Sequence, residues 1–198
     1  MLGLVNRSIQ NFLTDTFGER IWYAVACKAG VSPEGFEPML SYEDALTDRL
    51  LDVACETLDR RLFDFLEDLG TYLSTREPVR RLLRYGGRDY VDFLRSLNEL
   101  QGRTQLALED LKLPELTLRG LGVGRYTLSV IGAPPGWGAV FAGVLRAMAD
   151  DYGALVLIEL NEHTEDGPAG EAIAVQLLDS FHASGRSFDL SDAAGAEM

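Results

Sequence analysis

Residues 82–106 read LLRYGGRDYVDFLRSLNELQGRTQL, and the interpretation of the whole chain starts from this stretch. After two adjacent glycines, Leu94 and Leu97 repeat at the spacing of one helix face. One turn further on, the same face carries Gln101, an uncharged amide on an otherwise apolar stripe. Burying an amide without a partner costs about 1–3 kcal/mol. We therefore expect Gln101 to be hydrogen-bonded across an interface or to stay in water, and a plain polar gap and a ligand role both remain open.

The chain before this stretch shows only helical periodicity. Apolar residues recur every three or four positions, Gly18 and Gly30 end the first two segments, and Pro78 begins a short fifth one. From the glycine pair onward, one long helix is expected from Arg88 to about Leu111. The earlier predicted helices fall within 2–17, 21–29, 41–58, 62–73 and 78–85.

After Pro114 the period of the apolar residues changes to two, which is typical of strands. Two strands are predicted on either side of a turn at Gly122-Val-Gly124, and a helix is predicted from Trp137 to Asp151. Two further strands are predicted at 154–160 and 172–178, with a turn around 166–168.

This order of elements predicts an α+β fold. A helical N-terminal lobe of about 1–85 is followed by a lobe of about 86–182, in which helices pack on an antiparallel sheet of about four strands. We expect a single domain over 1–182 and a flexible C-terminal tail over 183–198, where Ser, Gly, Ala and Asp dominate.

The charge of the chain excludes several kinds of partner. With 31 acidic and 18 basic residues the net charge is −13, which repels phosphate backbones and anionic membranes. We interpret the basic run 76–88 as the polar face of two short helices, and a docking patch for an acidic partner is the second interpretation. No apolar run could span a membrane and no signal peptide begins the chain, so a cytoplasmic protein is expected.

The side chains that carry chemistry do not form a recognisable catalytic or metal site in the sequence. His163 and His182 occupy one late segment and lack further ligands at metal-binding spacing. Cys27 and Cys55 lie inside helical patterns without a Cys-x-x-Cys motif, and we expect two buried, reduced thiols. The chain is therefore not expected to be an enzyme.

Four segments follow one another with the spacing of a known family. They are MLGLVNRSIQNFL with FGERIW, LLRYGGRDYVDFLRSLNEL, PELTLRG at Pro114, and GWGAVFAGVLRAMADDYG. Together they resemble the H-NOX family of haem-nitric oxide/oxygen-binding domains, which includes the sensor domain of soluble guanylate cyclase. The resemblance runs from residue 1 to about 180.

The resemblance implies a helical lobe over a lobe of strands and helices, with a b-type haem between them. In the family one histidine, in a pattern like F-L-x-x-L-x-x-L-H, holds the iron, and Tyr-x-Ser-x-Arg grips the propionates. Nitric oxide breaks the iron–histidine bond and changes the activity of a partner. That partner is a signalling protein in trans, a histidine kinase or a cyclase.

This chain departs from the family at both places. Gln101 stands at the position of the haem ligand, and a primary amide does not bind iron as a neutral imidazole does. Val130, Gly132 and Pro134 stand at the Tyr, Ser and Arg positions, and a shift of one residue gives Ile131, Ala133 and Pro135 instead. Neither register supplies a donor or a cation for propionates. Haem b, expected from the family, is therefore predicted to be absent.

An apolar cavity between the lobes could remain without haem. It would hold a hydrophobic ligand or collapse into a packed core. The residues expected to face one another across it, beside Gln101, are Val5, Ile9, Leu97, Val140 and Val144.

The leading interpretation is a non-enzymatic H-NOX-like regulatory domain that acts on a separate signalling partner, with the inter-lobe hinge or another ligand as its switch. The alternative is a haem-binding nitric oxide sensor with a substitute axial ligand from His163, His182 or a cysteine. Such a sensor would select nitric oxide over oxygen, because the stretch GWGAVFAGV contains no tyrosine. An enzyme that uses the inter-lobe pocket is a third interpretation, but no nucleophile–base pair supports it.

Overall fold

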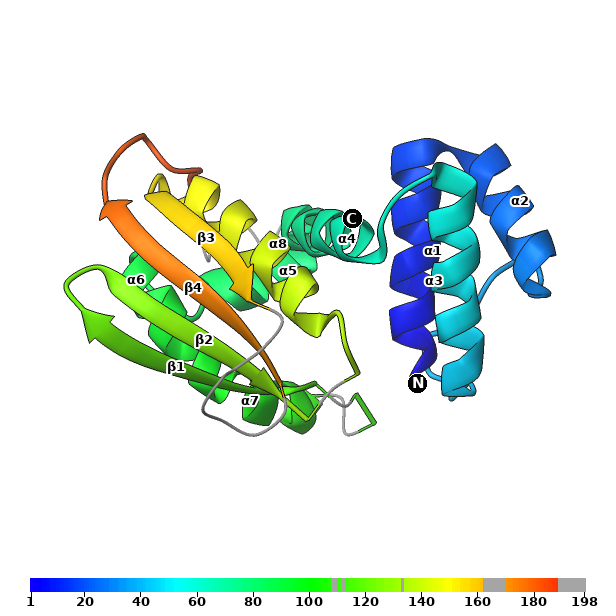
Figure 1. Cartoon of the computed structure of the whole chain (residues 1–198), viewed down its shortest axis with the longest axis horizontal. Coiled ribbons are helices and arrows are strands. Elements are labelled where there is room, and N and C mark those ends of the chain that lie inside the picture. Colours follow the sequence, from blue (N-terminus) through cyan, green and yellow to red (C-terminus); the bar gives the residue numbers. More distant parts are fainter. Residues whose placement is uncertain (108–109, 112, 133, 162–169, 189–198) are drawn as a thin grey trace, which may run out of the picture.

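Helices form the first half of the chain and an antiparallel sheet dominates the second half, as the periodicity predicts (Figure 1). The structure is a computed structural model that describes residues 1–107, 110–111, 113–132, 134–161 and 170–188. The first three helices stand together at one end of the molecule and the sheet lies at the other end, with α4 and α8 between them (Figure 1).

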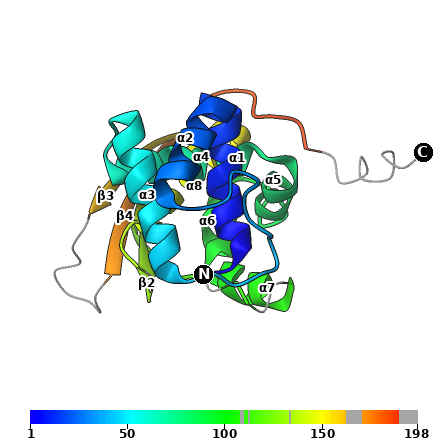
Figure 2. The same cartoon turned by 90° about the vertical axis from the view of Figure 1, so that its right-hand side faces the viewer.

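The N-terminal lobe consists of five helices (Figure 2). The apolar faces of α1 to α4 meet in one core, whereas Leu83 of α5 belongs to the core of the sheet lobe. The sequence-based segments agree with the observed helices to within a few residues. These are α1 (Gly3–Phe17), α2 (Glu19–Ala29), α3 (Asp44–Leu58), α4 (Leu62–Thr75) and α5 (Glu77–Arg84).

The helix predicted from Arg88 to Leu111 is not continuous. It is divided into α6 (Tyr90–Ser96), a 3₁₀ turn η1 (Leu97–Glu99) and α7 (Leu100–Ala107), and residues 108–109 lie outside the described residues. The Ser96 hydroxyl donates a hydrogen bond to the Phe93 carbonyl at 2.8 Å, which competes with the regular helical pattern. Asn98 Oδ1 also accepts a hydrogen bond from the Leu118 N–H at 2.7 Å. These two contacts favour a tighter turn at this point.

The sheet has four antiparallel strands in the order β1-β2-β4-β3, and α6 to α8 lie on one of its faces (Figure 1). The hairpin predicted at Gly122-Val-Gly124 is confirmed, and both glycines have positive φ angles that a larger residue rarely adopts. The turn predicted around 166–168 lies outside the described residues. The elements are β1 (Glu115–Gly122), β2 (Arg125–Ile131), α8 (Trp137–Tyr152), β3 (Leu155–Asn161) and β4 (Gly170–Asp179).

Helices α4 and α8 join the two lobes through an unusually close contact. A Cβ atom on Gly70 would lie 2.0 Å from the carbonyl oxygen of Val140, and one on Gly143 would lie 2.0 Å from that of Glu67. Only glycine permits this approach of the two backbones. The Glu67 carboxylate also pairs with Arg146 at 2.7 Å. Helix α4, although it belongs to the helical half of the chain, is therefore fixed to the sheet lobe.

Within the described residues, no helix is both long and apolar enough to cross a membrane. The division at 182/183 between domain and tail stays a prediction. Residues up to Phe188 are described, and the backbone N–H groups of Ala183 and Arg186 donate to the carbonyls of Gly153 and Asp151 at 3.0 and 2.9 Å.

Candidate functional site

Gln101 lies in the first turn of α7, directly after the buried Leu97 and Leu100. Its side chain is half-buried, and Nε2 donates a hydrogen bond to the carbonyl oxygen of Leu113 at 3.1 Å. Leu113 belongs to the segment that leads into β1, so the amide binds within its own lobe. The Asn98 amide contacts β1 one turn earlier, where its oxygen accepts a hydrogen bond from the backbone N–H of Leu118. Together these amides attach the η1–α7 segment to the first strand.

The residues predicted at the Tyr-x-Ser-x-Arg positions, taken in the first of the two registers, follow one another out of β2. Val130 is buried on β2 and lies opposite Leu116 of β1. Gly132 is exposed and has a φ of +75°, and Pro134 is exposed as well. Pro114, which the resemblance places at the start of the following strand, is buried immediately before β1. None of these side chains can donate a hydrogen bond or carries a positive charge.

An acidic residue that the sequence analysis did not single out lies beside these positions. Glu171 of β4 is the direct cross-strand partner of Val130 on β2, so both side chains point to the same face of the sheet. The Glu171 carboxylate accepts backbone hydrogen bonds from Gly136 (Oε1, 3.0 Å) and Gly138 (Oε2, 2.7 Å). A half-buried anion therefore caps the first turn of α8.

The physical basis of this contact is the helix terminus. The first N–H groups of a helix have no partner inside the helix, and the aligned peptide dipoles favour a negative charge there. The N-cap residue, Gly136, has no side chain that could serve as acceptor, so a carboxylate 33 to 35 residues further along the chain takes this role. A Cβ atom on Gly138 would lie only 2.9 Å from the Glu171 Cβ, so this glycine allows the approach.

The residues expected to line an inter-lobe pocket divide between two apolar cores. Ile9 belongs to the core of α1 to α4, and Val5 and Val140 pack against it. Leu97 and Val144 belong to the core between the sheet and its helices. Helix α8 contributes to both cores. A common cavity around these five residues stays a prediction.

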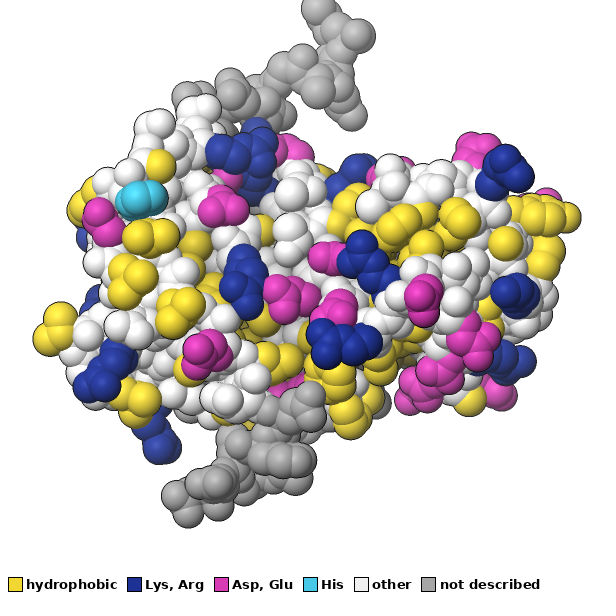
Figure 3. Space-filling model, turned by 45° about the horizontal axis from the view of Figure 1, so that its top comes forward, with side chains coloured by type: hydrophobic (Ala, Val, Ile, Leu, Met, Phe, Trp, Pro, Cys, Tyr) yellow, Lys and Arg dark blue, Asp and Glu magenta, His cyan; other side chains and the backbone are white. Residues whose placement is uncertain are grey.

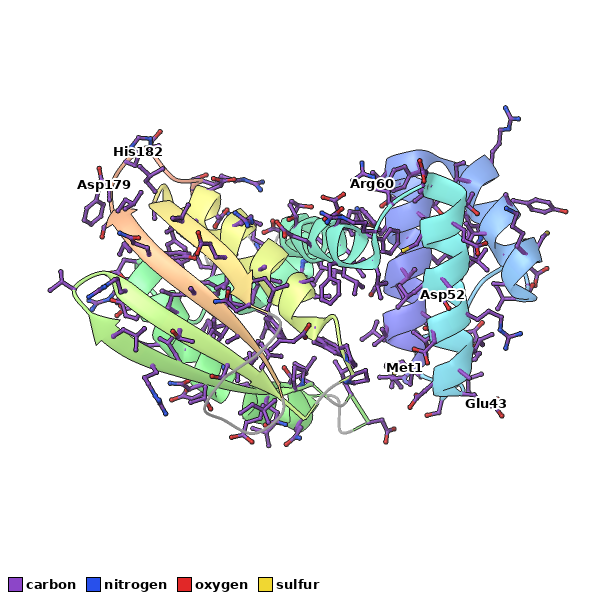
Figure 4. The ribbon with its side chains drawn as sticks, in the orientation of Figure 1. Met1, Glu43, Asp52, Arg60, Asp179 and His182 are labelled. Carbon is purple, nitrogen blue, oxygen red and sulfur yellow. The ribbon has the colours of Figure 1, made fainter. Side chains whose placement is uncertain are left out.

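Three of the substitute ligands considered from the sequence lie in the described part of the chain, and all three are poorly placed. His182 is exposed beyond β4, near Asp179, and lies at the opposite end of the lobe from α7 (Figures 1, 3 and 4). His163 lies outside the described residues. The expectation of two buried thiols is wrong, because Cys27 is exposed on α2 and Cys55 of α3 is only partly buried against the helical core. Burial, and then the charge of Asp52, raise the pKa of the Cys55 thiol.

Metal ligation has no obvious place in the described part of the chain. No group of three or more His, Cys, Asp or Glu side chains there could hold a metal ion. The surface pockets of the described residues include one of about 660 Å³ and one of about 500 Å³. Neither is lined by Gln101, Val130, Gly132 or Pro134.

Comparisons with known proteins bear on the fold and the family of the chain. A family model described as haem-NO-binding (HNOB) matches residues 2–160. Among solved structures, a Cs H-NOX mutant with 4-cyano-L-phenylalanine at site 5 has a TM-score of 0.77 at 14% identity, covering 93% of this chain and 100% of that one. An Fe(II) unliganded mutant of the H-NOX protein from K. algicida has a TM-score of 0.74 at 16% identity, with 89% and 96% covered.

A third solved structure, an oxygen-binding H-NOX domain related to soluble guanylate cyclases, has a TM-score of 0.71 at 14% identity. The alignment covers 94% of this chain and 100% of that one. At these identities the solved structures establish the fold. Comparison with curated proteins gave no match.

Proposed function

The chain belongs to the haem-NO-binding (H-NOX) family, and from this premise we propose that it is a non-catalytic regulatory domain that does not hold haem in the family's way and acts on a separate signalling protein. The family binds haem and signals to partner proteins. The proposal therefore keeps the family's role in signalling and replaces its usual cofactor chemistry. By family resemblance the partner is a histidine kinase or a cyclase.

The observation that carries the proposal is the Glu171 carboxylate beside Val130. Haem propionates are anions and need donors or cations, whereas this position offers an apolar side chain next to a carboxylate. Two like charges about 4 Å apart repel each other by roughly 4 kcal/mol at an effective dielectric constant near 20. The α8 N-terminus, which could have attracted an anion, is already occupied by Glu171. These residues do not fit a propionate.

Gln101 supports the same conclusion on the other side of the expected haem. Its Nε2 is engaged with the Leu113 carbonyl, and its amide oxygen is a weak ligand for iron compared with an imidazole nitrogen. The contacts of Gln101 and Asn98 instead tie the helix segment to β1. The segment that would be released in the family has structural partners of its own here.

A switch without haem would use the movement of α1 to α3 against the rest of the molecule. The glycine contacts of α4 and α8 make these two helices one unit. Helix α3 is joined to α4 by residues 59–61, where Asp59 adopts a left-handed conformation with φ of +51°. A ligand other than haem, or the partner itself, would bias the position of the first three helices.

Haem content after expression tests the proposal. The chain is produced in cells supplied with iron and a haem precursor, and haem per chain is measured as the pyridine haemochrome. The proposal expects wild-type protein without a Soret band, and stoichiometric haem in the wild type would refute it.

Gln101→His is the matched variant, with circular dichroism as the check on folding. It is expected to stay without stoichiometric haem, because Glu171 and the lost propionate contacts remain. A haem-loaded Gln101→His protein would show that the missing histidine alone explains the loss.

A further inference from the structure

The basic run in the middle of the chain forms a defined surface feature that the proposed function does not use. Residues 76–95 contain six arginines and three acidic residues, whereas the whole chain has a net charge of −13. This stretch spans α5, the double-glycine turn and nearly all of α6. It is therefore the place where a strongly acidic protein is locally positive.

A groove of about 660 Å³ opens at this place. Its walls come from the end of α5, from α6 with η1, and from the segment after β4. The lining side chains that matter here are Arg84, Arg88, Arg95, Asp92, Glu99 and Phe188.

The inner wall of the groove is rigid. The Arg84 guanidinium carbon lies 4.0 Å from the ring centre of Tyr152 and 5.2 Å from that of Phe188. Its Nε also lies 3.4 Å from the buried carboxylate of Asp151. Gly86 brings the turn directly against α6, since a Cβ there would lie 2.2 Å from Ser96 Oγ. A partner would meet a preformed surface, which reduces the entropic cost of binding.

The groove as a whole is lined by three arginines and two carboxylates, and two of the arginines form its outer wall. The Arg88 and Arg95 side chains are 96% and 68% exposed, and they share one carboxylate, Asp92, at 3.5 and 3.9 Å. Such exposed pairs contribute little to stability. Their guanidinium groups can therefore turn to another carboxylate at small cost, and arginine is well suited to bidentate recognition of carboxylates.

The mixture of charges favours a peptide over a phosphate-rich ligand. Asp92 and Glu99 line the groove together with the arginines, and two carboxylates would repel a dense polyanion. Tyr85, which is 73% exposed, and the half-buried Phe188 add apolar surface between the charges. An acidic segment with an apolar side chain between its carboxylates matches this pattern.

We propose that this groove docks an acidic segment of the signalling partner. The inference rests on the proposed function in that the occupant belongs to the partner. It also places the docked segment on α6 and η1, which lead directly to Gln101 in α7. A docked partner would thus contact the part of the chain that joins the helices to the first strand.

Binding of a defined peptide to the 198-residue chain tests the docking site. The probe is a short fluorescein-labelled peptide in which pairs of Asp or Glu alternate with single Phe or Leu, followed by fluorescence anisotropy. The double variant Arg88→Glu/Arg95→Glu is expected to bind at least about tenfold more weakly, and binding should weaken with added salt. The matched control Arg119→Glu/Arg125→Glu reverses two exposed charges on the sheet and should stay within about twofold of the wild type.

Several results would overturn the docking site. One is that the wild type does not bind the labelled peptide, and another is that both double variants lose the same amount of peptide affinity. A third is that inorganic pyrophosphate competes with the labelled peptide more strongly than unlabelled peptide does. A chain truncated after Phe188 that binds the probe much more tightly would assign the groove to the chain's own acidic end, which contains Asp189, Asp192 and Glu197. Because the haem content of these variants is measured separately, failure here leaves the proposed function intact.

Discussion

The Glu171 carboxylate of β4 accepts a hydrogen bond from the backbone N–H of Gly138 in α8 at 2.7 Å. This contact connects the last described strand to the start of α8, beside Val130, which the resemblance predicts to be one of the family's propionate-binding positions. The same carboxylate accepts from Gly136, so it satisfies two N–H groups that the helix itself leaves without partners. An anion supplied by the chain thus occupies a place where the cofactor's anions would be expected.

Replacing Glu171 with glutamine should destabilise the fold by about 1–2 kcal/mol, since hydrogen bonds to a charged acceptor are worth about 1.5–3 kcal/mol each and this group is only half-buried. The amide keeps one acceptor but presents an NH₂ group to the other N–H. Urea unfolding measures the change in the free energy of unfolding. Glu159→Gln, on the exposed side of β3, is the matched control and should have little effect. Equal stability of Glu171→Gln and wild type would contradict the role given to the carboxylate.

Gly70→Ala and Gly143→Ala should each cost about 2–3 kcal/mol or more, because overpacking of a close helix contact forces the backbones apart. Each new Cβ would lie 2.0 Å from a carbonyl oxygen of the opposite helix. Gly102→Ala in α7 is the control, because no atom lies within 4 Å of its added Cβ. That variant should be neutral or slightly more stable, as alanine favours helix. Thermal unfolding of the three variants distinguishes these outcomes.

Cys55 should react slowly with iodoacetamide in the folded protein, because burial and Asp52 raise its pKa above the ordinary value of 9.0. A raised pKa leaves less Cys55 in the thiolate form at pH 8–9. The pH at which the alkylation rate of Cys55 increases should therefore be higher in the folded chain than in urea. By the same linkage, the stability associated with the neutral thiol is present below pH 9 and is lost as the pH rises through the folded pKa. Mass spectrometry of alkylated peptides gives both rates. Identical pH profiles in the folded and unfolded states would refute the shift.

Arg80→Met should cost about 3–5 kcal/mol, since it leaves a buried carboxylate without its main partner. Arg80 Nε donates to Asp151 Oδ1 at 2.7 Å, and both side chains are buried. Adding Asp151→Leu to the Arg80→Met chain should recover a large part of the lost free energy of unfolding, because the unpaired buried carboxylate is then removed. Chemical unfolding of the single and double variants measures this coupling. A double variant that is less stable than Arg80→Met would contradict the account.

Much of the fold follows from local patterns. The helical periods predict α1 to α5 and α8. The alternating segments predict β1, β2 and the hairpin between them, and the continuous apolar run at 154–160 with a partner strand at 172–178 predicts β3 and β4. The break between α6 and α7 follows only in part from a local contact, that of the Ser96 hydroxyl with the Phe93 carbonyl, because it also depends on Asn98 reaching Leu118 of a later strand. The close approach of Gly70 to Val140 is likewise a contact between distant segments.

The candidate site also contains one residue that the sequence indicates and one that it does not. Gln101 is visible in the sequence because an amide interrupts an apolar stripe, and a hydrogen bond for it could be expected from the cost of burial. Glu171 gives no such signal, since an acidic residue at the start of a strand is ordinary. Its importance depends on the strand register that sets it opposite Val130 and on a helix that begins 35 residues earlier at Gly136.

Titration of the purified wild-type chain with ferric haemin, followed by absorbance in the Soret region, tests the central claim most directly. The account predicts a spectrum equal to the sum of the protein and free haemin, with no saturable shift. A sharp Soret band that saturates at one haemin per chain would contradict it, and would mean that neither Gln101 nor Glu171 prevents this member of the family from holding haem.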